Sequence, residues 1–147
     1  MYAMAYAHLY DMASKIIASH QIKYRGIFPY RIKIVQNDSV INAFCIPGGY
    51  IYVYTGLIHF LENDAELAGV MAHEIAHAEC RHSVHQMVSS QLIRFGIMMV
   101  LGADPGFLIG LMENMLHLSF SREDETEADT YAVYYINSTP YHPLGIQ

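Results

Sequence analysis

Hydrophobic residues recur at spacings of three and four near the start of the chain, with polar residues between them. Within residues 2–20 the apolar positions are Tyr2, Tyr6, Leu9, Met12, Ala13, Ile16 and Ile17. Because an α-helix completes a turn in under four residues, this spacing places the apolar side chains along one face. The segment is therefore predicted to form an amphipathic helix on the surface of the domain.

The pattern changes to short β-rich segments between residues 31 and 54. The candidate strands cover residues 32–35, 40–44 and 50–54. Asn-Asp at residues 37–38 and Pro-Gly-Gly at residues 47–49 separate them, and such residues are typical of turns. We therefore predict a small, mainly antiparallel sheet.

A long helix is predicted to follow this sheet and to begin near Asp64. Asn63 is a suitable N-cap, and Glu66 occupies the capping-box position three residues later. The helical pattern can continue past His85 and as far as Met99, before a segment rich in glycine and proline ends it.

Two further helices are predicted towards the C-terminus. One covers about residues 107–117. For the other, Ser121 and Asp124 three residues later are typical of an N-cap, and the helix is expected to end near Asn137. Together these elements predict an α+β fold in which a small antiparallel sheet packs on a helical body.

The composition agrees with a single folded unit. A chain of 147 residues that is 53% hydrophobic and 15% charged can bury a core, but it is short for two domains. Residues 1–147 are therefore expected to form one domain. Because the polar residues at the end resemble the beginning of a further element, we expect the chain to be trimmed at one or both ends.

Charge and cysteine usage exclude several classes of protein. The net charge is −6 and the 8 Lys and Arg residues are scattered, so nucleic acid is not an expected partner. Cys45 and Cys80 lack the close spacing of a thiolate metal site and are expected to pack as small hydrophobic residues. Arg94 and Asp104 interrupt the apolar residues 92–112, so no transmembrane segment is expected. No secretory signal is recognisable at the beginning of the chain.

The pattern His-Glu-x-x-His occupies residues 73–77, within the long predicted helix. Four residues advance a helix by about 400°, so His73 and His77 lie on one face, one turn apart. This separation suits two imidazoles that bind one Zn²⁺ ion, and a catalytic zinc site adds a third protein ligand and a water. Glu74 lies beside this face, where it can act as general base on that water. The alternative is a chance occurrence, which the small and apolar neighbours on the helix argue against.

A third zinc ligand is available in the acidic residues 123–129. Glu125 and Asp129 share a helix face, so one could bind the metal while the other accepts the ring N–H of a ligand histidine. The alternative is an acidic helix N-terminus that the helix dipole stabilises, which suits Glu123 and Asp124. Spacing alone does not choose among these acids.

Three stretches of the sequence resemble the gluzincin metallopeptidases of the HtpX-like, CAAX-prenyl-endopeptidase-like and BepA-like group. They are residues 42–57 (NAFCIPGGYIYVYTGL), residues 66–77 (ELAGVMAHEIAH) with Arg81-His82, and residues 121–129 (SREDETEAD). Their order is that of the family. The resemblance implies a zincin-like fold around the HExxH helix, one Zn²⁺ per chain, and hydrolysis of peptide bonds in protein or peptide substrates.

The resemblance also assigns individual site residues. The family's third ligand is the Glu of an E-x-x-x-D motif, which places the ligand at Glu125 and its companion acid at Asp129. It further places Asn42, Ala43 and Phe44 at a sheet edge beside the cleft, where an extended substrate pairs as an added strand. Main-chain hydrogen bonds to such an edge bind a peptide with little regard to its side chains, so broad specificity is expected.

One departure from part of this group concerns the membrane. The HtpX-like and prenyl-endopeptidase-like relatives carry transmembrane helices, which this sequence lacks. A soluble or envelope-associated relative is therefore closer. The residues leave the compartment open, and the resemblance implies the cell envelope or periplasm, with misfolded or envelope proteins among the substrates. Residues 87–117 are expected to form a compact pair of helices that could cover the site.

The remaining histidines are judged by their positions. His82 follows His73 by nine residues, which on a continuous helix places it on the opposite face from the ligands. It is therefore expected to make a structural hydrogen bond and not to bind the metal. His85 and Cys80 are expected to be packing or surface residues, and His142, after the last helix, is a candidate to stabilise an oxyanion.

These features together predict a zinc-dependent metalloendopeptidase in which Glu74 activates the zinc-bound water. Two other functions fit part of the pattern. A latent or non-proteolytic protein, with a chaperone-like or regulatory role, would keep the zinc while another segment closes the cleft. A purely structural zinc site usually has four protein ligands, and this sequence offers three.

Overall fold

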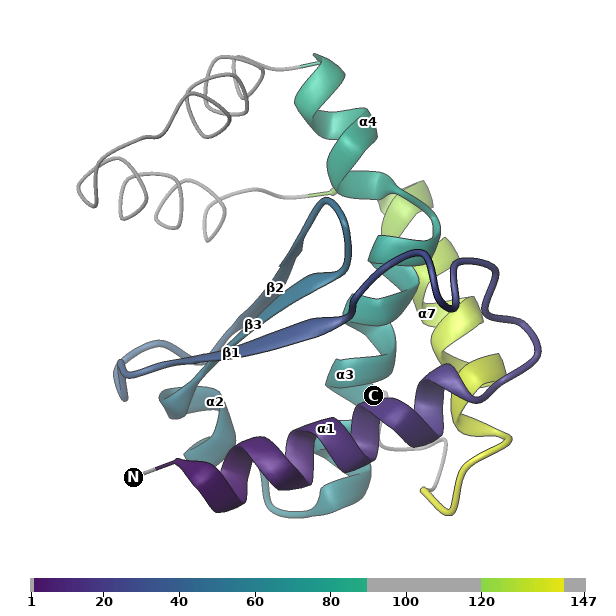
Figure 1. The fold of residues 1–147 in the computed structure, drawn as a ribbon. Helices are drawn as coiled ribbons and strands as arrows, with labels where there is room; N and C mark the ends of the chain where they lie inside the picture. The colour runs from purple at the N-terminus through teal and green to yellow at the C-terminus, as the bar shows by residue number, and fades with distance from the viewer. Residues whose placement is uncertain (1, 90–119, 142–147) are drawn as a thin grey trace.

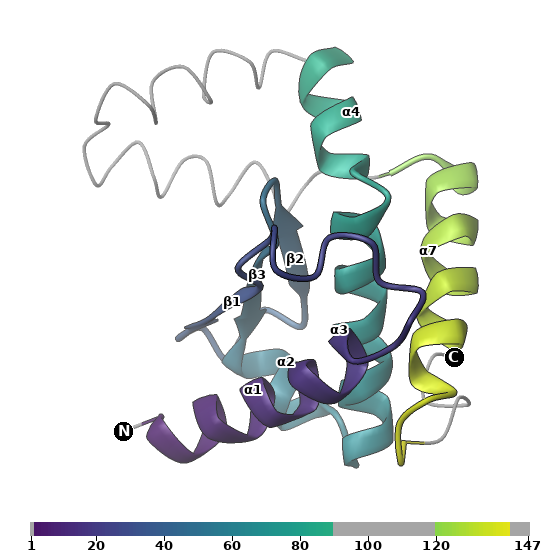
Figure 2. The ribbon, with the colours of Figure 1, turned by 45° about the vertical axis from the view of Figure 1, so that its right-hand side comes forward.

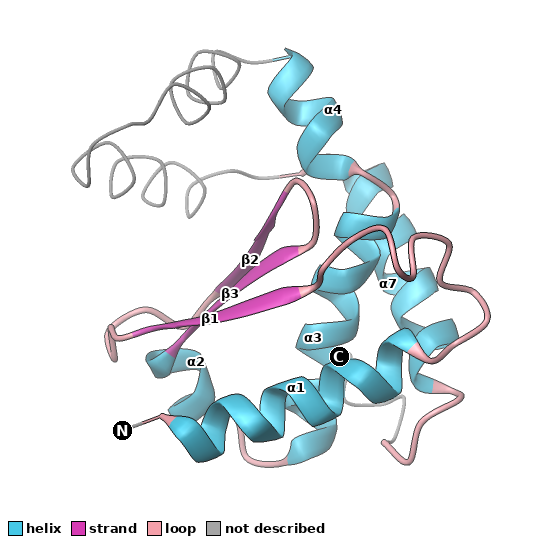
Figure 3. Cartoon of the chain, viewed as in Figure 1, coloured by secondary structure: helices cyan, strands magenta, loops and turns pink. Residues whose placement is uncertain are grey.

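The computed structural model describes residues 2–89 and 120–141, to which the structural statements below refer. Its elements are, in chain order, α1 (Ala3–Ile17), β1 (Arg31–Val35), β2 (Ala43–Ile46), β3 (Tyr50–Tyr54), α2 (Thr55–Phe60), α3 (Asp64–Glu79), α4 (His82–Ser89) and α7 (Arg122–Ile136) (Figure 1). Helix α3 lies between the sheet and α7 in both ribbon views (Figure 2). The combination of helices with a small sheet is the predicted α+β class (Figure 3).

The strands form one mixed sheet in the order β1-β3-β2. Strand β2 pairs antiparallel with β3, whereas β1 pairs parallel with β3. The prediction of an antiparallel sheet is therefore correct for the hairpin and wrong for β1. The chain reverses between β1 and β2 and again at the hairpin turn, so β3 runs in the same direction as β1. Gly48 and Gly49 form that turn with φ angles of 93° and 81°, which glycine adopts at little cost.

The hydrophobic core lies between the sheet and helices α1, α3 and α7. Helix α1 buries its predicted apolar face, and α3 packs against β2, α1 and, most extensively, α7. Both α3 and α7 carry fully buried alanines: Ala68, Ala72, Ala76, Ala128 and Ala132. Small side chains let two helices approach closely, and buried alanines on both helices agree with the extensive packing of α3 against α7.

Helix α3 begins where the sequence predicts. The side-chain oxygen of Asn63 accepts a hydrogen bond from the backbone N–H of Glu66 at 3.0 Å. The Glu66 carboxylate in turn accepts from the N–H of Glu62 at 2.8 Å, one residue earlier than in the usual capping box. The N-cap prediction is therefore confirmed.

The same helix ends earlier than the sequence predicts. Its last residue is Glu79, and Arg81 adopts the left-handed conformation with a φ angle of 60°. A new helix, α4, begins at His82. The prediction of one continuous helix past His85 is therefore wrong, although no glycine or proline marks the break.

Helix α7 follows its predicted boundaries. The Ser121 hydroxyl accepts from the N–H of Asp124 at 3.1 Å, and the C-cap is Asn137. The predicted helix at 107–117, the expected cover at 87–117 beyond Ser89, and His142 lie outside the described residues. Among the helices that the structure describes, none is long and apolar enough to cross a membrane.

Gly56 at the start of α2 lies against the loop that leads into β2. A Cβ atom there would lie 2.6 Å from the carbonyl oxygen of Asp38 and closer still to that of Val40. We expect Gly56→Ala to lower the free energy of unfolding by about 3 kcal/mol, because the new methyl group would clash with backbone atoms, which cannot move aside as a flexible side chain can. Urea denaturation measures the change.

Gly26→Ala is the matched control, because a Cβ atom at Gly26 meets nothing within 4 Å. For this variant we expect the free energy of unfolding to fall by only about 1 kcal/mol, because alanine is less stable than glycine in a left-handed backbone conformation. A loss for Gly56→Ala no larger than that for Gly26→Ala would contradict the packing argument.

Candidate active site

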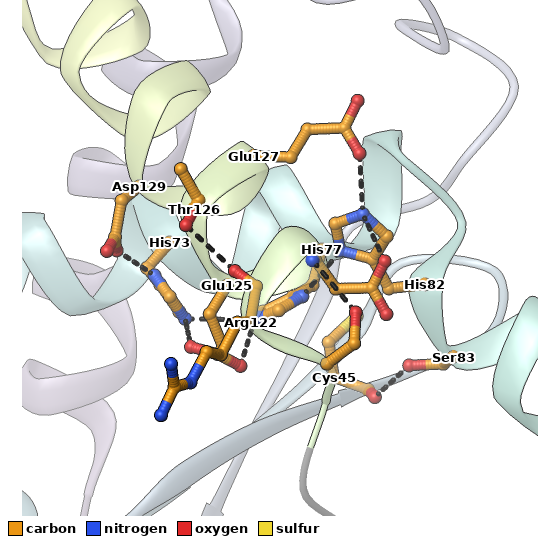
Figure 4. Close-up of polar contacts among 12 residues, drawn as sticks. Cys45, His73, His77, His82, Ser83, Arg122, Glu125, Thr126, Glu127 and Asp129 are labelled. Atoms are coloured by element: carbon orange, nitrogen blue, oxygen red, sulfur yellow. Dashed lines mark hydrogen bonds and ion pairs between the residues drawn. The ribbon is translucent and has the colours of Figure 1, made fainter.

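His73 and His77 lie one turn apart on α3, and Glu125 of α7 lies opposite them (Figure 4). The Nε2 atoms of the two histidines are 2.9 Å apart. One carboxylate oxygen of Glu125 lies 3.3 Å from Nε2 of His73, and the other lies 3.3 Å from Nε2 of His77. The structure therefore brings together the three side chains predicted to bind the metal.

These separations fit a tetrahedral zinc ion. Ligand atoms about 2.0–2.1 Å from Zn²⁺ at tetrahedral angles lie roughly 3.3–3.4 Å from one another. The two histidine nitrogens are 2.9 Å apart, and each lies 3.3 Å from one of the two Glu125 oxygens, so an ion would require little movement of the side chains. Three protein ligands leave the fourth position to water, as in catalytic zinc sites.

His77 is held in the form that a metal needs. Its residue is 1% exposed, and burial, together with the neighbouring His73 and His82, lowers its pKa to about 3. A neutral imidazole is the form that binds metals. The ring of Phe120 stacks on the His77 ring at a centroid distance of 4.2 Å. No local pattern in the sequence predicts this contact, which covers one face of the imidazole.

Asp129 lies beside the other histidine of the pair. Its carboxylate accepts a hydrogen bond from Nδ1–H of His73 at 2.8 Å. This leaves Nε2 of His73 directed at Glu125 and His77 (Figure 4). A carboxylate in this position fixes the tautomer and the orientation of a metal-binding imidazole.

Glu74 is buried next to these groups. It is 8% exposed, and burial, followed by the charge of Glu125, raises its pKa to about 8. A cation held between His73, His77 and Glu125 would oppose this shift, because it favours the ionised carboxylate. A carboxyl group whose pKa lies near neutrality is suited to both accept and return a proton.

Two cavities adjoin these residues and the edge of the sheet. The larger has a volume of about 710 Å³ and the smaller about 180 Å³. Asn42, Ala43, His73 and Glu74 line both of them, and Phe44 lines the smaller. The residues predicted to bind substrate therefore lie in the same cavity walls as the candidate base.

The main chain of β2 is partly occupied along its free edge. Asn42 pairs with β3 through its carbonyl oxygen, which accepts from the N–H of Tyr54 at 3.2 Å. In an antiparallel ladder the pairing alternates, so the main-chain groups of Ala43 and Cys45 point away from β3. The Ser83 hydroxyl donates to the Cys45 carbonyl at 2.9 Å. Helix α4 thus occupies the end of the edge that follows Ala43.

His82 lies beside His77 and not on the opposite face. Because α3 ends at Glu79, the chain turns at Arg81 and brings the His82 side chain back towards the site. Nδ1 of His82 is 2.8 Å from Nδ1 of His77. The prediction of a structural hydrogen bond is confirmed for His82, and the predicted face is wrong because it assumed a continuous helix.

Cys80, His82 and Glu127 form a second group whose ligand atoms lie within 4.8 Å of one another. Burial raises the pKa of Cys80 to about 11, so without a metal the thiol is neutral near pH 7. A bound metal would displace the thiol proton, so this pKa alone does not decide whether the group binds one. Cys45 is buried, as predicted, and His85 is an exposed surface residue.

The chain is similar to known peptidases along most of its length. A family described as Peptidase family M48 matches residues 5–147. Mitochondrial metalloendopeptidase OMA1 of Arabidopsis thaliana is 34% identical over 116 residues, which are 75% of this chain and 23% of that protein. The beta-barrel assembly-enhancing protease of Escherichia coli (strain K12) is 29% identical over 133 residues, covering 80% and 27% of the two chains. The chain spans only about a quarter of the length of these two relatives.

Proposed function

Since the chain belongs to peptidase family M48, we propose that it is the catalytic domain of a zinc-dependent metalloendopeptidase that cleaves protein substrates. Membership of this family implies a metal, usually zinc. In the proposed site, His73, His77 and Glu125 are the ligands. The observation that carries the proposal is the convergence of their three ligand atoms within 4.8 Å, from two helices that are distant in the sequence.

Bound zinc would supply a Lewis acid that polarises the scissile carbonyl and lowers the pKa of a water molecule. Glu74 then accepts the proton of the attacking water and returns it to the leaving nitrogen, so that the C–N bond breaks as the amine is protonated. Asp129 fixes the orientation of the His73 ring, because its carboxylate oxygen lies 2.8 Å from Nδ1 of His73. Phe120 covers one ring face of His77 and limits the access of water there.

An extended peptide is proposed to bind along the edge of β2 at Asn42, Ala43 and Phe44. Ala43 would supply the main-chain groups, which point away from β3, and its N–H would exchange the Asn42 side-chain oxygen, 2.8 Å away, for the substrate. Support comes from the position of β2 at the edge of the sheet and from the cavities that join it to Glu74. Because Ser83 already binds the carbonyl of Cys45, pairing would be confined to a short stretch of the substrate. Binding through the main chain favours broad side-chain specificity.

The proposed substrates are proteins, and the names of the relatives narrow them further. One relative is named for β-barrel assembly and another for mitochondria. We propose misfolded or envelope proteins as substrates of this chain, in the cell envelope, following the β-barrel assembly-enhancing relative. His142 remains a proposed oxyanion-stabilising residue.

Removal of the metal tests this function. We expect the purified protein to contain one zinc ion per chain by elemental analysis, and a zinc chelator to abolish cleavage of casein, because both the polarised carbonyl and the activated water depend on the ion. Added zinc should restore cleavage, and a non-chelating isomer of the chelator should have no effect. A protein without metal, or cleavage that is insensitive to the chelator, would rule out this mechanism.

A further inference from the structure

A series of side-chain hydrogen bonds begins at His77 and leads away from the proposed metal site. Nδ1 of His77 is 2.8 Å from Nδ1 of His82, and Nε2 of His82 is 2.9 Å from a carboxylate oxygen of Glu127. A carboxylate oxygen of Asp124 lies 3.6 Å from the same Nε2. These contacts connect α3, the beginning of α4 and the first turns of α7 (Figure 4).

The direction of these hydrogen bonds follows from the chemistry of imidazole. A neutral imidazole that binds a metal through Nε2 carries its proton on Nδ1. His77 therefore donates from Nδ1–H, and Nδ1 of His82 accepts. The remaining proton of a neutral His82 is then on Nε2, from which it is donated to the carboxylate of Glu127.

The environment of His82 supports a fixed orientation. The residue is 1% exposed, whereas the side chain of Glu127 is 51% exposed. A buried imidazole whose two nitrogens are both engaged has little freedom to rotate. The charged carboxylate of Glu127 is at the surface, where it stays hydrated and little desolvation free energy is lost.

The geometry points to His82 as a positioning residue for the metal site, which it serves by fixing the tautomer and the ring orientation of His77. The inference rests on the metal site of the proposed function. The two ligand histidines are then oriented in different ways. Asp129 binds His73 directly, whereas Glu127 acts on His77 through a second imidazole.

While a metal occupies the His73, His77 and Glu125 site, the same argument excludes a second metal bound by Cys80, His82 and Glu127. A metal bound at Nε2 of His82 would require the proton of that neutral ring on Nδ1. Two Nδ1–H groups, from His77 and His82, would then face each other at 2.8 Å without an acceptor. Occupation of the His73, His77 and Glu125 site therefore keeps Nε2 of His82 as a hydrogen-bond donor.

Zinc affinity, measured by competition with a chromogenic chelator, tests the inference without any substrate. We expect His82→Leu to weaken zinc binding by about 10- to 100-fold, as is typical for the loss of a group that orients a metal ligand. His82→Gln should bind within a few-fold of the unmodified protein, because its amide can both accept from His77 and donate to Glu127. The absorption spectrum of the cobalt-substituted protein should change in His82→Leu and be preserved in His82→Gln.

His85→Leu is the matched control, since His85 is an exposed histidine of the same helix. Zinc affinity of His82→Leu equal to that of His85→Leu would overturn the inference, and so would equal losses in His82→Leu and His82→Gln. If His82→Leu does not fold, Glu127→Ala at the surface serves in its place, because it removes the oxygen that accepts from Nε2–H of His82. A loss of several-fold in Glu127→Ala supports the positioning role, and no change overturns it. If the unmodified protein binds no zinc, the proposed function fails as well, whereas tight binding in every variant removes only this inference.

Discussion

Replacement of Glu74 by glutamine is expected to lower kcat for peptide hydrolysis by about 10²–10⁴-fold, the usual contribution of a general base. Glutamine keeps the shape of the side chain but cannot accept the proton of the attacking water. Zinc content should be unchanged, because Glu74 is not among the three proposed ligands. Cleavage of a quenched fluorescent peptide, alongside elemental analysis, measures both quantities.

Glu74→Asp is the companion variant for this test. It retains a carboxylate but withdraws it by one methylene, so its activity should lie between those of the unmodified protein and Glu74→Gln. Near-normal turnover in Glu74→Gln would remove Glu74 from the mechanism. If Glu74→Gln lost all cleavage but kept full biological function in cells, the latent or chaperone-like alternative would be favoured.

Substitution of Glu125 by alanine is expected to weaken zinc binding more than any substitution outside the ligand set. Loss of an orienting group costs roughly 10- to 100-fold in affinity, and loss of a charged ligand should exceed this range. One Glu125 oxygen lies 3.3 Å from Nε2 of His73 and the other 3.3 Å from Nε2 of His77, and no solvent molecule would restore the charge of this carboxylate. Cleavage should fall to background at zinc concentrations that saturate the unmodified protein.

Glu123→Ala is the control for this prediction. Glu123 is an exposed acid in the first turn of the same helix, so it shares the helix dipole and the local charge of Glu125. We expect its zinc affinity to be that of the unmodified protein. Equal losses in the two variants would mean that the charge of the helix N-terminus, and not a specific ligand, determines the affinity.

The features predicted well from the sequence are those that depend on neighbouring residues. The N-caps at Asn63 and Ser121 are satisfied by residues three positions later, so a short stretch of sequence contains the whole interaction. The pairing of His73 with His77 depends only on the helical repeat within one turn. For the acids of α7, spacing left the choice open, and only the resemblance to a family assigned Glu125.

The features that could not be predicted depend on residues distant in the sequence. Helix α3 ends at Glu79, whose carboxylate accepts from the backbone N–H groups of Lys23 and Tyr24 and from the hydroxyl of Tyr30. No residue near the break reveals these contacts, so the helix appeared continuous. The wrong prediction that His82 lies on the face opposite the ligands followed from this assumption of a continuous helix.

The parallel pairing of β1 was missed for a similar reason. Alternation of apolar residues identifies a strand but not its neighbour, and β1 pairs with β3, although β2 intervenes in the sequence. The stacking of Phe120 on His77 likewise joins segments on either side of a long stretch of chain. Contacts of this kind are determined by the whole fold.

The buried alanines of α3 and α7 bear on how inactive variants of this chain should be interpreted. Two of the proposed metal ligands are on α3 and the third is on α7, so the distances between the ligand atoms depend on how closely the two backbones approach. A larger side chain at Ala76 or Ala128, both fully buried, would overpack the core that both helices share, and so would shift the metal ligands without altering any donor atom. Genetic screens for loss of zinc would therefore recover substitutions of buried alanines as well as substitutions of the ligands themselves. Spectroscopy of the bound ion would distinguish these two kinds of variant.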